Sequence, residues 1–163
     1  SKKMYQRIVK EGHTLGMHSY SHQYKEIYQS MDAFQADYER ISNCLTAATG
    51  IKPLYYRFPG GSTEATEKLQ MTDLDAYFNA QGASYFDWNV IAANNTTDDV
   101  SVNKMVDSVM NGVALYDTSI VLMYDSVDRK MTAKSLDSIL DYLLKNGYEI
   151  LPIDENTIPI HHS

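Results

Sequence analysis

Two kinds of apolar pattern alternate along this chain of 163 residues. Short segments with the composition of buried strands lie at 14–18, 54–58, 84–88, 119–124 and 148–151, and longer segments with helical spacing separate them. Because the crossover between two parallel strands is usually a helix, this strict alternation predicts a parallel sheet. The sheet would be either open and doubly wound or closed into a barrel.

Capping residues mark where the expected helices begin and end. Ser30 is expected to begin a long helix that ends at Gly50, and Thr132 to begin the last helix. The residues before Gly12 have the spacing of the last two turns of a helix. The first strand–helix repeat is therefore expected to begin within its helix, without the strand that precedes it. Because even a minimal barrel needs about 200 residues, we expect one or two βα units upstream of Ser1.

Polar and aromatic residues follow the expected strands where each strand finishes. In a (β/α) barrel, side chains at the C-terminal ends of the strands gather at one face and form the active site. This distribution therefore favours a barrel over an open sheet. The residues are His18, His22, Arg57, Asp87, Trp88, Tyr124 and Asp125.

Two histidines, His18 and His22, lie four residues apart behind the first expected strand. Neutral imidazole is a common ligand of zinc and related divalent metals, and a catalytic site needs about three protein ligands and an open position for water. The pair therefore indicates a catalytic metal site whose third ligand has to be found. The alternative is that two of the five histidines fall at this spacing by chance.

Charge and composition narrow the class of partner. The formal net charge of -7, without any run of lysine or arginine, argues against nucleic acid and anionic membranes, and a neutral substrate fits better. No apolar run reaches the about 18 residues of a membrane span. The single cysteine, Cys44, excludes an intrachain disulfide.

The strand ends, read in order, give four motifs: His18-Ser19-Tyr20-Ser21-His22, Arg57-Phe58-Pro59-Gly60-Gly61, Asp87-Trp88-Asn89 and Leu122-Met123-Tyr124-Asp125. This series resembles the polysaccharide deacetylase family, also called the NodB-homology domain or carbohydrate esterase family 4. The resemblance implies an irregular (β/α) barrel over residues 1–163, with a C-terminal tail at 153–163. It also implies an extracellular or cell-envelope hydrolase that removes acetyl groups from a polysaccharide such as peptidoglycan or a chitin-like chain.

The same resemblance implies a role for each motif residue. His18 and His22 would be two of three ligands to a divalent metal, typically zinc, and Ser19 would support their loop. Such a metal polarises the acetyl carbonyl and lowers the pKa of a bound water. Arg57 would orient the catalytic base, unless it forms an ordinary surface ion pair. Asp87 would tune the general-acid histidine.

Four further residues would contact substrate if the resemblance holds. Pro59 and Gly60 would form a tight turn beside the polysaccharide, Trp88 would stack on a sugar ring, and Leu122 would line the pocket for the acetyl methyl group. Each residue also has a purely structural alternative, because turns, buried indoles and strand leucines are common in any core.

Two departures from the family pattern decide how much function transfers. The opening pair of aspartates, which supplies the general base and the third metal ligand, has no counterpart in residues 1–14. Tyr124 replaces the general-acid histidine, and a phenol with a pKa near 10 donates a proton poorly at neutral pH. We therefore expect a metal-dependent N-deacetylase domain of weak or no activity. The alternatives are a non-catalytic carbohydrate-binding domain and an O-acetyl polysaccharide esterase.

Overall fold

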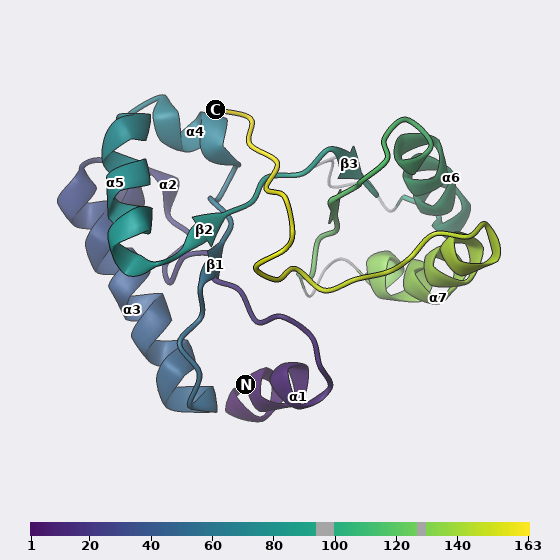
Figure 1. Cartoon of the computed structure of the whole chain (residues 1–163), viewed down its shortest axis with the longest axis horizontal. Helices are drawn as coiled ribbons and strands as arrows, with labels where there is room; N and C mark the ends of the chain where they lie inside the picture. Colours follow the sequence, from purple (N-terminus) through teal and green to yellow (C-terminus); the bar gives the residue numbers. More distant parts are fainter. Residues whose placement is uncertain (94–99, 127–129) are drawn as a thin grey trace. The chain divides into compact units, whose positions relative to one another are not determined.

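The structure, a computed structural model, describes residues 1–93, 100–126 and 130–163. It has a mixed α/β architecture, and the strand pairs in the described residues are parallel, which confirms the predicted pairing. The chain divides into two compact units, both drawn in Figure 1. The first unit comprises Ser1–Asp87 and Pro152–Ser163, and the second comprises Trp88–Leu151.

The first unit contains helices α1 to α5 and strands β1 and β2. Their bounds are α1 Lys2–Lys10, α2 Tyr24–Ile27, α3 Met31–Thr49, β1 Tyr55–Tyr56, α4 Ser62–Thr66, α5 Met71–Gln81 and β2 Ser84–Tyr85. Tyr56 of β1 lies opposite Tyr85 of β2, and a parallel bridge joins Met17 to Tyr56. Three segments distant in the sequence are therefore aligned side by side.

Helix α3 begins and ends where its sequence predicts. The Ser30 side chain accepts a hydrogen bond from the backbone N–H of Ala33, as an N-cap residue does. At the other end, Gly50 has a left-handed φ of 78°, the conformation that glycine adopts most readily. The helix therefore presents a fixed face to the rest of the first unit.

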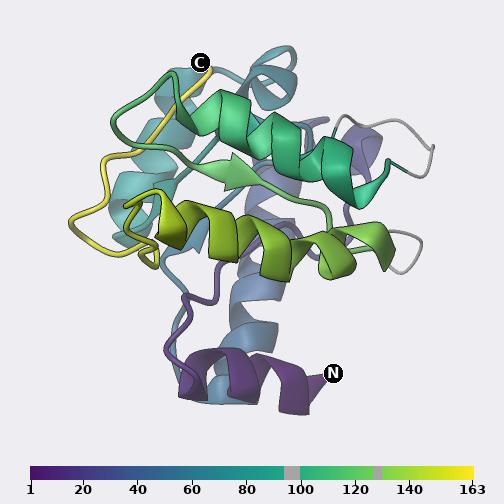
Figure 2. The same ribbon diagram turned by 90° about the vertical axis from the view of Figure 1, so that its right-hand side faces the viewer.

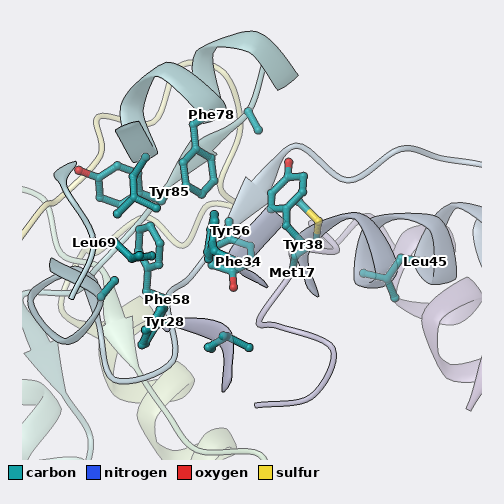
Figure 3. Close-up of a cluster of buried hydrophobic side chains, with 14 residues drawn as sticks. Met17, Tyr28, Phe34, Tyr38, Leu45, Tyr56, Phe58, Leu69, Phe78 and Tyr85 are labelled. Atoms are coloured by element: carbon teal, nitrogen blue, oxygen red, sulfur yellow. The ribbon is translucent and has the colours of Figure 1, made fainter. Parts of the chain in front are cut away.

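Aromatic side chains fill the core of the first unit, as Figure 3 shows. Phe34 of α3 is completely buried, and its ring centroid lies 5.7 Å from those of Tyr56 and Phe58. Aromatic pairs in such geometry contribute about 0.5–1.5 kcal/mol each beyond the burial of their area. This packing ties α3 to the strand segment that leads into the Arg57 motif.

The second unit contains β3 Val90–Ile91, α6 Val102–Val113, β4 Val121–Leu122 and α7 Lys130–Lys145. β3 and β4 pair in parallel, with Val90 opposite Val121. Helices α6 and α7, green and yellow-green, lie side by side in Figure 2. Gly112 lets α6 approach β3 closely, because a Cβ at this position would lie 2.5 Å from Cγ1 of Val90.

The expected strands are shorter in the structure, and one of them is absent. Residues 148–151 form no strand, and Leu151 is 69% exposed. Within the described residues, this apolar segment pairs with no other strand. The expected strand 84–88 is shorter and ends at Tyr85, although the backbone N–H of Phe86 still donates to the carbonyl of Tyr56. The backbone N–H of Asp87, on the opposite edge, donates to the carbonyl of Ile160. A separate strand, β3, then begins at Val90 and was not predicted.

The expected strand at 14–18 is reduced to the single bridge at Met17. The described strands form two separate two-stranded sheets, so closure into a barrel stays a prediction. No helix in the described part of the chain is long and apolar enough to cross a membrane.

Candidate metal centre

Residues from three strand ends meet within the first unit. The backbone N–H of Arg57 donates to the carbonyl of Met17, and that of Phe86 donates to the carbonyl of Tyr56. Because this register is parallel, His18, Arg57 and Phe86 each follow the aligned residues at the same edge. The structure therefore brings His18 close to the Arg57 and Asp87 motifs.

The two histidine side chains face each other through their outer nitrogens. The Nε2 atoms of His18 and His22 lie 3.3 Å apart, and the ring centroids are 5.0 Å apart. The Nδ1 atom of His18 lies 2.8 Å from the carbonyl oxygen of Arg57. A carbonyl accepts but cannot donate, so Nδ1 holds the proton and Nε2 presents a lone pair toward His22.

The surroundings of His18 favour its neutral form. Burial lowers the pKa of this imidazole, and the hydrogen bond to the Arg57 carbonyl offsets part of that effect. The nearby charges of His22 and Arg57 lower the pKa further. Metal ions bind the neutral imidazole, so His18 is in the metal-binding state near pH 7.

The histidine pair fits a divalent metal. Two imidazole nitrogens at about 2.0–2.1 Å from a tetrahedral zinc ion would lie about 3.3–3.4 Å apart, which matches the separation of the two Nε2 atoms. Among the described residues, no group of three or more histidine, cysteine, aspartate or glutamate side chains is arranged to hold an ion. The described chain therefore offers two ligands of a possible site.

The loop between the histidines has an unusual backbone. Ser19 and His22 have φ angles of 70° and 56°, in the left-handed region that residues other than glycine seldom adopt. The hydroxyl of Ser19 accepts a hydrogen bond from the backbone N–H of His22 and donates one to Asp37 of α3. Ser19 therefore supports this loop, as the family resemblance implied.

Asp37 is a site residue that sequence reasoning missed. Burial alone would raise the pKa of its carboxyl, but hydrogen bonds from Ser19, Tyr20 and Ser21 outweigh that effect and lower the pKa below its usual value. One sequence signal was present: Asp37 occupies the i+3 position after Phe34, within an otherwise apolar helical stripe.

Arg57 is oriented by the main chain of the segment after β2. Its Nε donates to the carbonyl of Phe86 at 3.1 Å, and one terminal nitrogen donates to the carbonyl of Asp87 at 3.4 Å. These bonds fix the plane of the guanidinium. Its predicted role toward a catalytic base stays a prediction.

The carboxylate of Asp87 is completely buried, and both of its oxygens accept hydrogen bonds. It accepts hydrogen bonds from the backbone N–H and the hydroxyl of Ser62 and from the backbone N–H of His162. A buried carboxylate is stable only when its lone pairs are satisfied in this way. Asp87 therefore joins the start of α4 to the C-terminal segment.

The C-terminal segment, described above as a tail, is hydrogen-bonded into the first unit. The imidazole of His161 stacks on the ring of Tyr85 with centroids 3.9 Å apart, and its Nε2 lies 3.1 Å from the Tyr85 carbonyl. The backbone N–H of Ser163 donates to the hydroxyl of Ser62. Each of these two hydrogen bonds has a backbone group as one partner, and backbone groups leave no pattern in the sequence.

Hydrogen bonding and backbone geometry explain the residues of the Pro59-Gly60 turn. The buried Pro59 carbonyl accepts a hydrogen bond from the hydroxyl of Tyr28 at 2.8 Å. Gly60 has a φ of 80°, and a Cβ there would lie 2.8 Å from Cγ of Glu64. Glycine is therefore required by the turn itself, and contact of either residue with substrate stays a prediction.

Trp88, Leu122 and Tyr124 belong to the second unit. Leu122 lies in β4 and is 8% exposed, whereas Trp88 and Tyr124 are half-buried. Asn89, the last residue of the third strand-end motif, donates to the carbonyl of Thr118 and accepts from the backbone N–H of Ile120. It thereby fixes the segment that enters β4. A joint site of these residues with His18 is a proposal.

Known proteins resemble this chain along most of its length. Residues 1–78 match the family model described as polysaccharide deacetylase. The solved catalytic domain of peptidoglycan N-acetylglucosamine deacetylase from Eubacterium rectale ATCC 33656 is 32% identical, with a TM-score of 0.90 over 99% of this chain and 74% of that chain. A Streptococcus mutans CE4 esterase is 27% identical, with a TM-score of 0.82 over 94% of this chain and 68% of that chain.

The protein YheN of Bacillus subtilis (strain 168), named for the same family, is 24% identical over 98% of this chain and 55% of its own length. The chain thus spans little more than half of that curated relative. Together with the solved structures, these matches confirm the resemblance seen in the strand-end motifs. The chain belongs to the polysaccharide deacetylase family, carbohydrate esterase family 4.

Proposed function

We propose that this chain is part of a metal-dependent hydrolase that removes N-acetyl groups from a polysaccharide of N-acetylglucosamine, such as peptidoglycan. The 3.3 Å separation of the His18 and His22 Nε2 atoms supports this proposal most directly. It is the separation that a shared zinc ion requires. The 32% identical Eubacterium rectale relative is a peptidoglycan N-acetylglucosamine deacetylase, which supports the proposed substrate.

His18 and His22 would hold the divalent metal, with the Arg57 carbonyl fixing the His18 tautomer. When bound, such a metal supplies Lewis-acid chemistry toward the acetyl carbonyl and a water molecule. Arg57, whose guanidinium is oriented by two main-chain carbonyls, would position the carboxylate that removes a proton from that water. Asp87 would fix the edge of the site through Ser62 and His162.

The third metal ligand and the general base would come from a further segment, since the described residues contain no group of three potential ligands. We expect that segment to be a βα unit that pairs beside Met17 and contributes two aspartates. Its addition would extend the parallel strands toward the irregular barrel implied by the family motifs. An extracellular or cell-envelope location follows from the proposed polymer.

The polysaccharide would lie against the Pro59-Gly60 turn, with Trp88 against a sugar ring and Leu122 against the acetyl methyl group. Tyr124 would occupy the place of the general acid. A phenol protonates an amine leaving group poorly, and losing a general acid costs about 10²–10⁴-fold in rate. Tyr124 therefore favours slow deacetylation, or a second candidate function in which the domain binds carbohydrate without catalysis.

Acetate release tests the proposal. The natural protein, with any sequence that precedes Ser1, would be incubated with zinc and N-acetylglucosamine oligomers, beside the Tyr124→His and His22→Ala variants. We expect slow release by the unsubstituted protein, faster release by Tyr124→His and none by His22→Ala. Oligomer binding without acetate release, in both the natural protein and Tyr124→His, would favour the binding domain instead. Faster release from O-acetylated than from N-acetylated oligomers would identify an esterase.

A further inference from the structure

We infer that Asp37 is a positioning residue that holds the loop Ser19–His22 in the conformation that directs both imidazoles at one metal ion. This inference rests on the proposed metal role of His18 and His22. It assigns a function to a carboxylate on α3 that the strand-end motifs do not contain. Asp37 would act through the loop and would not itself touch the metal.

Asp37 accepts hydrogen bonds along the whole loop. Its Oδ2 accepts from the Ser19 hydroxyl at 2.7 Å and from the backbone N–H of Tyr20 at 2.9 Å. Its Oδ1 accepts from the backbone N–H of Ser21 at 2.9 Å. Since Ser19 in turn accepts from the backbone N–H of His22, one carboxylate is connected to four consecutive loop residues.

The loop needs such support because its backbone is strained. The left-handed φ angles of Ser19 and His22 persist in residues other than glycine only where the surroundings hold them. The three hydrogen bonds to Asp37 hold the segment that starts at the first of these positions, Ser19, and runs to the residue before the second, His22. Without them, the loop would relax toward ordinary backbone angles, and the His22 ring would turn away from His18.

A second residue of α3 contacts the same loop. The guanidinium carbon of Arg40 lies 3.9 Å from the centroid of the Tyr20 ring, a cation–π geometry. Arg40 follows Asp37 by three residues, so the two side chains project from the same face of the helix. One helix therefore contacts both the backbone and the side chain of Tyr20. The core packing of Phe34 fixes that helix in place.

The chemistry of a carboxylate is specific here. Both oxygens of Asp37 accept from donors, and an asparagine would keep only one acceptor oxygen and bring a donor NH₂ toward an N–H or O–H. The substitution Asp37→Asn preserves size and helix position but leaves part of the loop unsatisfied. Glu39→Gln makes the same change of acid to amide at an exposed position of the same helix and serves as the matched control.

The test uses the natural full-length protein and its Asp37→Asn, Ser19→Ala, Glu39→Gln and Leu45→Val variants. Zinc affinity and the visible spectrum of the cobalt-substituted protein report the metal site. Amide hydrogen exchange without metal reports the loop. Leu45→Val, in the core face of α3, controls for a general loss of stability.

We expect Asp37→Asn to lose about 10–100-fold in zinc affinity, to change the cobalt spectrum, and to lose amide protection at Tyr20 and Ser21. Glu39→Gln and Leu45→Val should bind zinc like the natural protein. Equal zinc affinity in Asp37→Asn and the natural protein would overturn the inference about Asp37 but would leave the proposed metal site in place. Failure of the natural protein itself to bind zinc would overturn the proposed metal site, and the inference with it.

Discussion

The Nε2 atoms of His18 and His22 lie 3.3 Å apart although neither histidine is in a helix. The first ring is placed by the parallel bridge between Met17 and Tyr56 and by the carbonyl of Arg57. The second ring is placed by a left-handed loop. The geometry of the two proposed metal ligands therefore depends on strand register on one side and on loop support from α3 on the other.

Asp87→Asn should destabilise the first unit. The completely buried carboxylate accepts from Ser62 and from the backbone of His162, and an amide would present a donor to at least one of these donors. Leaving buried donors unpaired costs about 1–3 kcal/mol each. Urea unfolding monitored by circular dichroism measures this loss, with Asp125→Asn as an exposed control. Unfolding midpoints that agree for the two variants would contradict the role given to Asp87.

Gly60→Ala should destabilise more than Gly147→Ala. Both glycines have a φ of 80°, so both substitutions introduce the same backbone strain, which is about 1–3 kcal/mol. Only at Gly60 would the added Cβ also clash with Glu64, 2.8 Å away, whereas Gly147 has open space. Thermal melting of both variants separates strain from clash. An equal loss of stability would show that the turn relaxes around the new methyl group.

Alkaline pH should unfold the first unit between about pH 10 and pH 12. Burial raises the pKa of Tyr38, Tyr77 and Tyr85 to about 12 each, from an ordinary value of 10.0. A group whose pKa is raised by folding stabilises the folded state fully below its unfolded pKa, and that contribution is lost as the pH rises through the folded value.

Absorbance of phenolate near 295 nm, recorded with circular dichroism, measures both events. We expect some tyrosines to ionise near pH 10 and a second group to ionise together with unfolding. Ionisation of all thirteen tyrosines near pH 10, in a chain that stays folded, would contradict the prediction that burial raises the pKa of the core tyrosines.

The alternation of apolar patterns was enough to predict parallel pairing and the ends of α3. It also predicted that His18, Arg57 and Asp87 would meet, because parallel register places successive strand ends at one edge. These features depend on local periodicity and on one topological rule. They are therefore readable from the sequence.

Other features depend on contacts that no local pattern encodes. The apolar run 148–151 has the composition of a strand but lacks a neighbour to pair with in the described structure. Asp37 supports a loop that lies sixteen to eighteen residues away in the sequence, and the Asp87 carboxylate is bound by backbone atoms of the C-terminal segment. Every residue except proline has the same backbone N–H, so the sequence does not show which of these groups will bind a given side chain.

Zinc titration of the natural protein, followed by two-bond ¹H–¹⁵N spectra of its imidazoles, tests the central claim most directly. Once the imidazole signals are assigned, including those of the five histidines in residues 1–163, the spectra show which rings bind the ion. We predict that the Nε2 resonances of His18 and His22 shift together on zinc binding while Nδ1 of His18 stays protonated. Zinc that leaves these two rings unchanged, or binds only at His13, His161 or His162, would contradict the account.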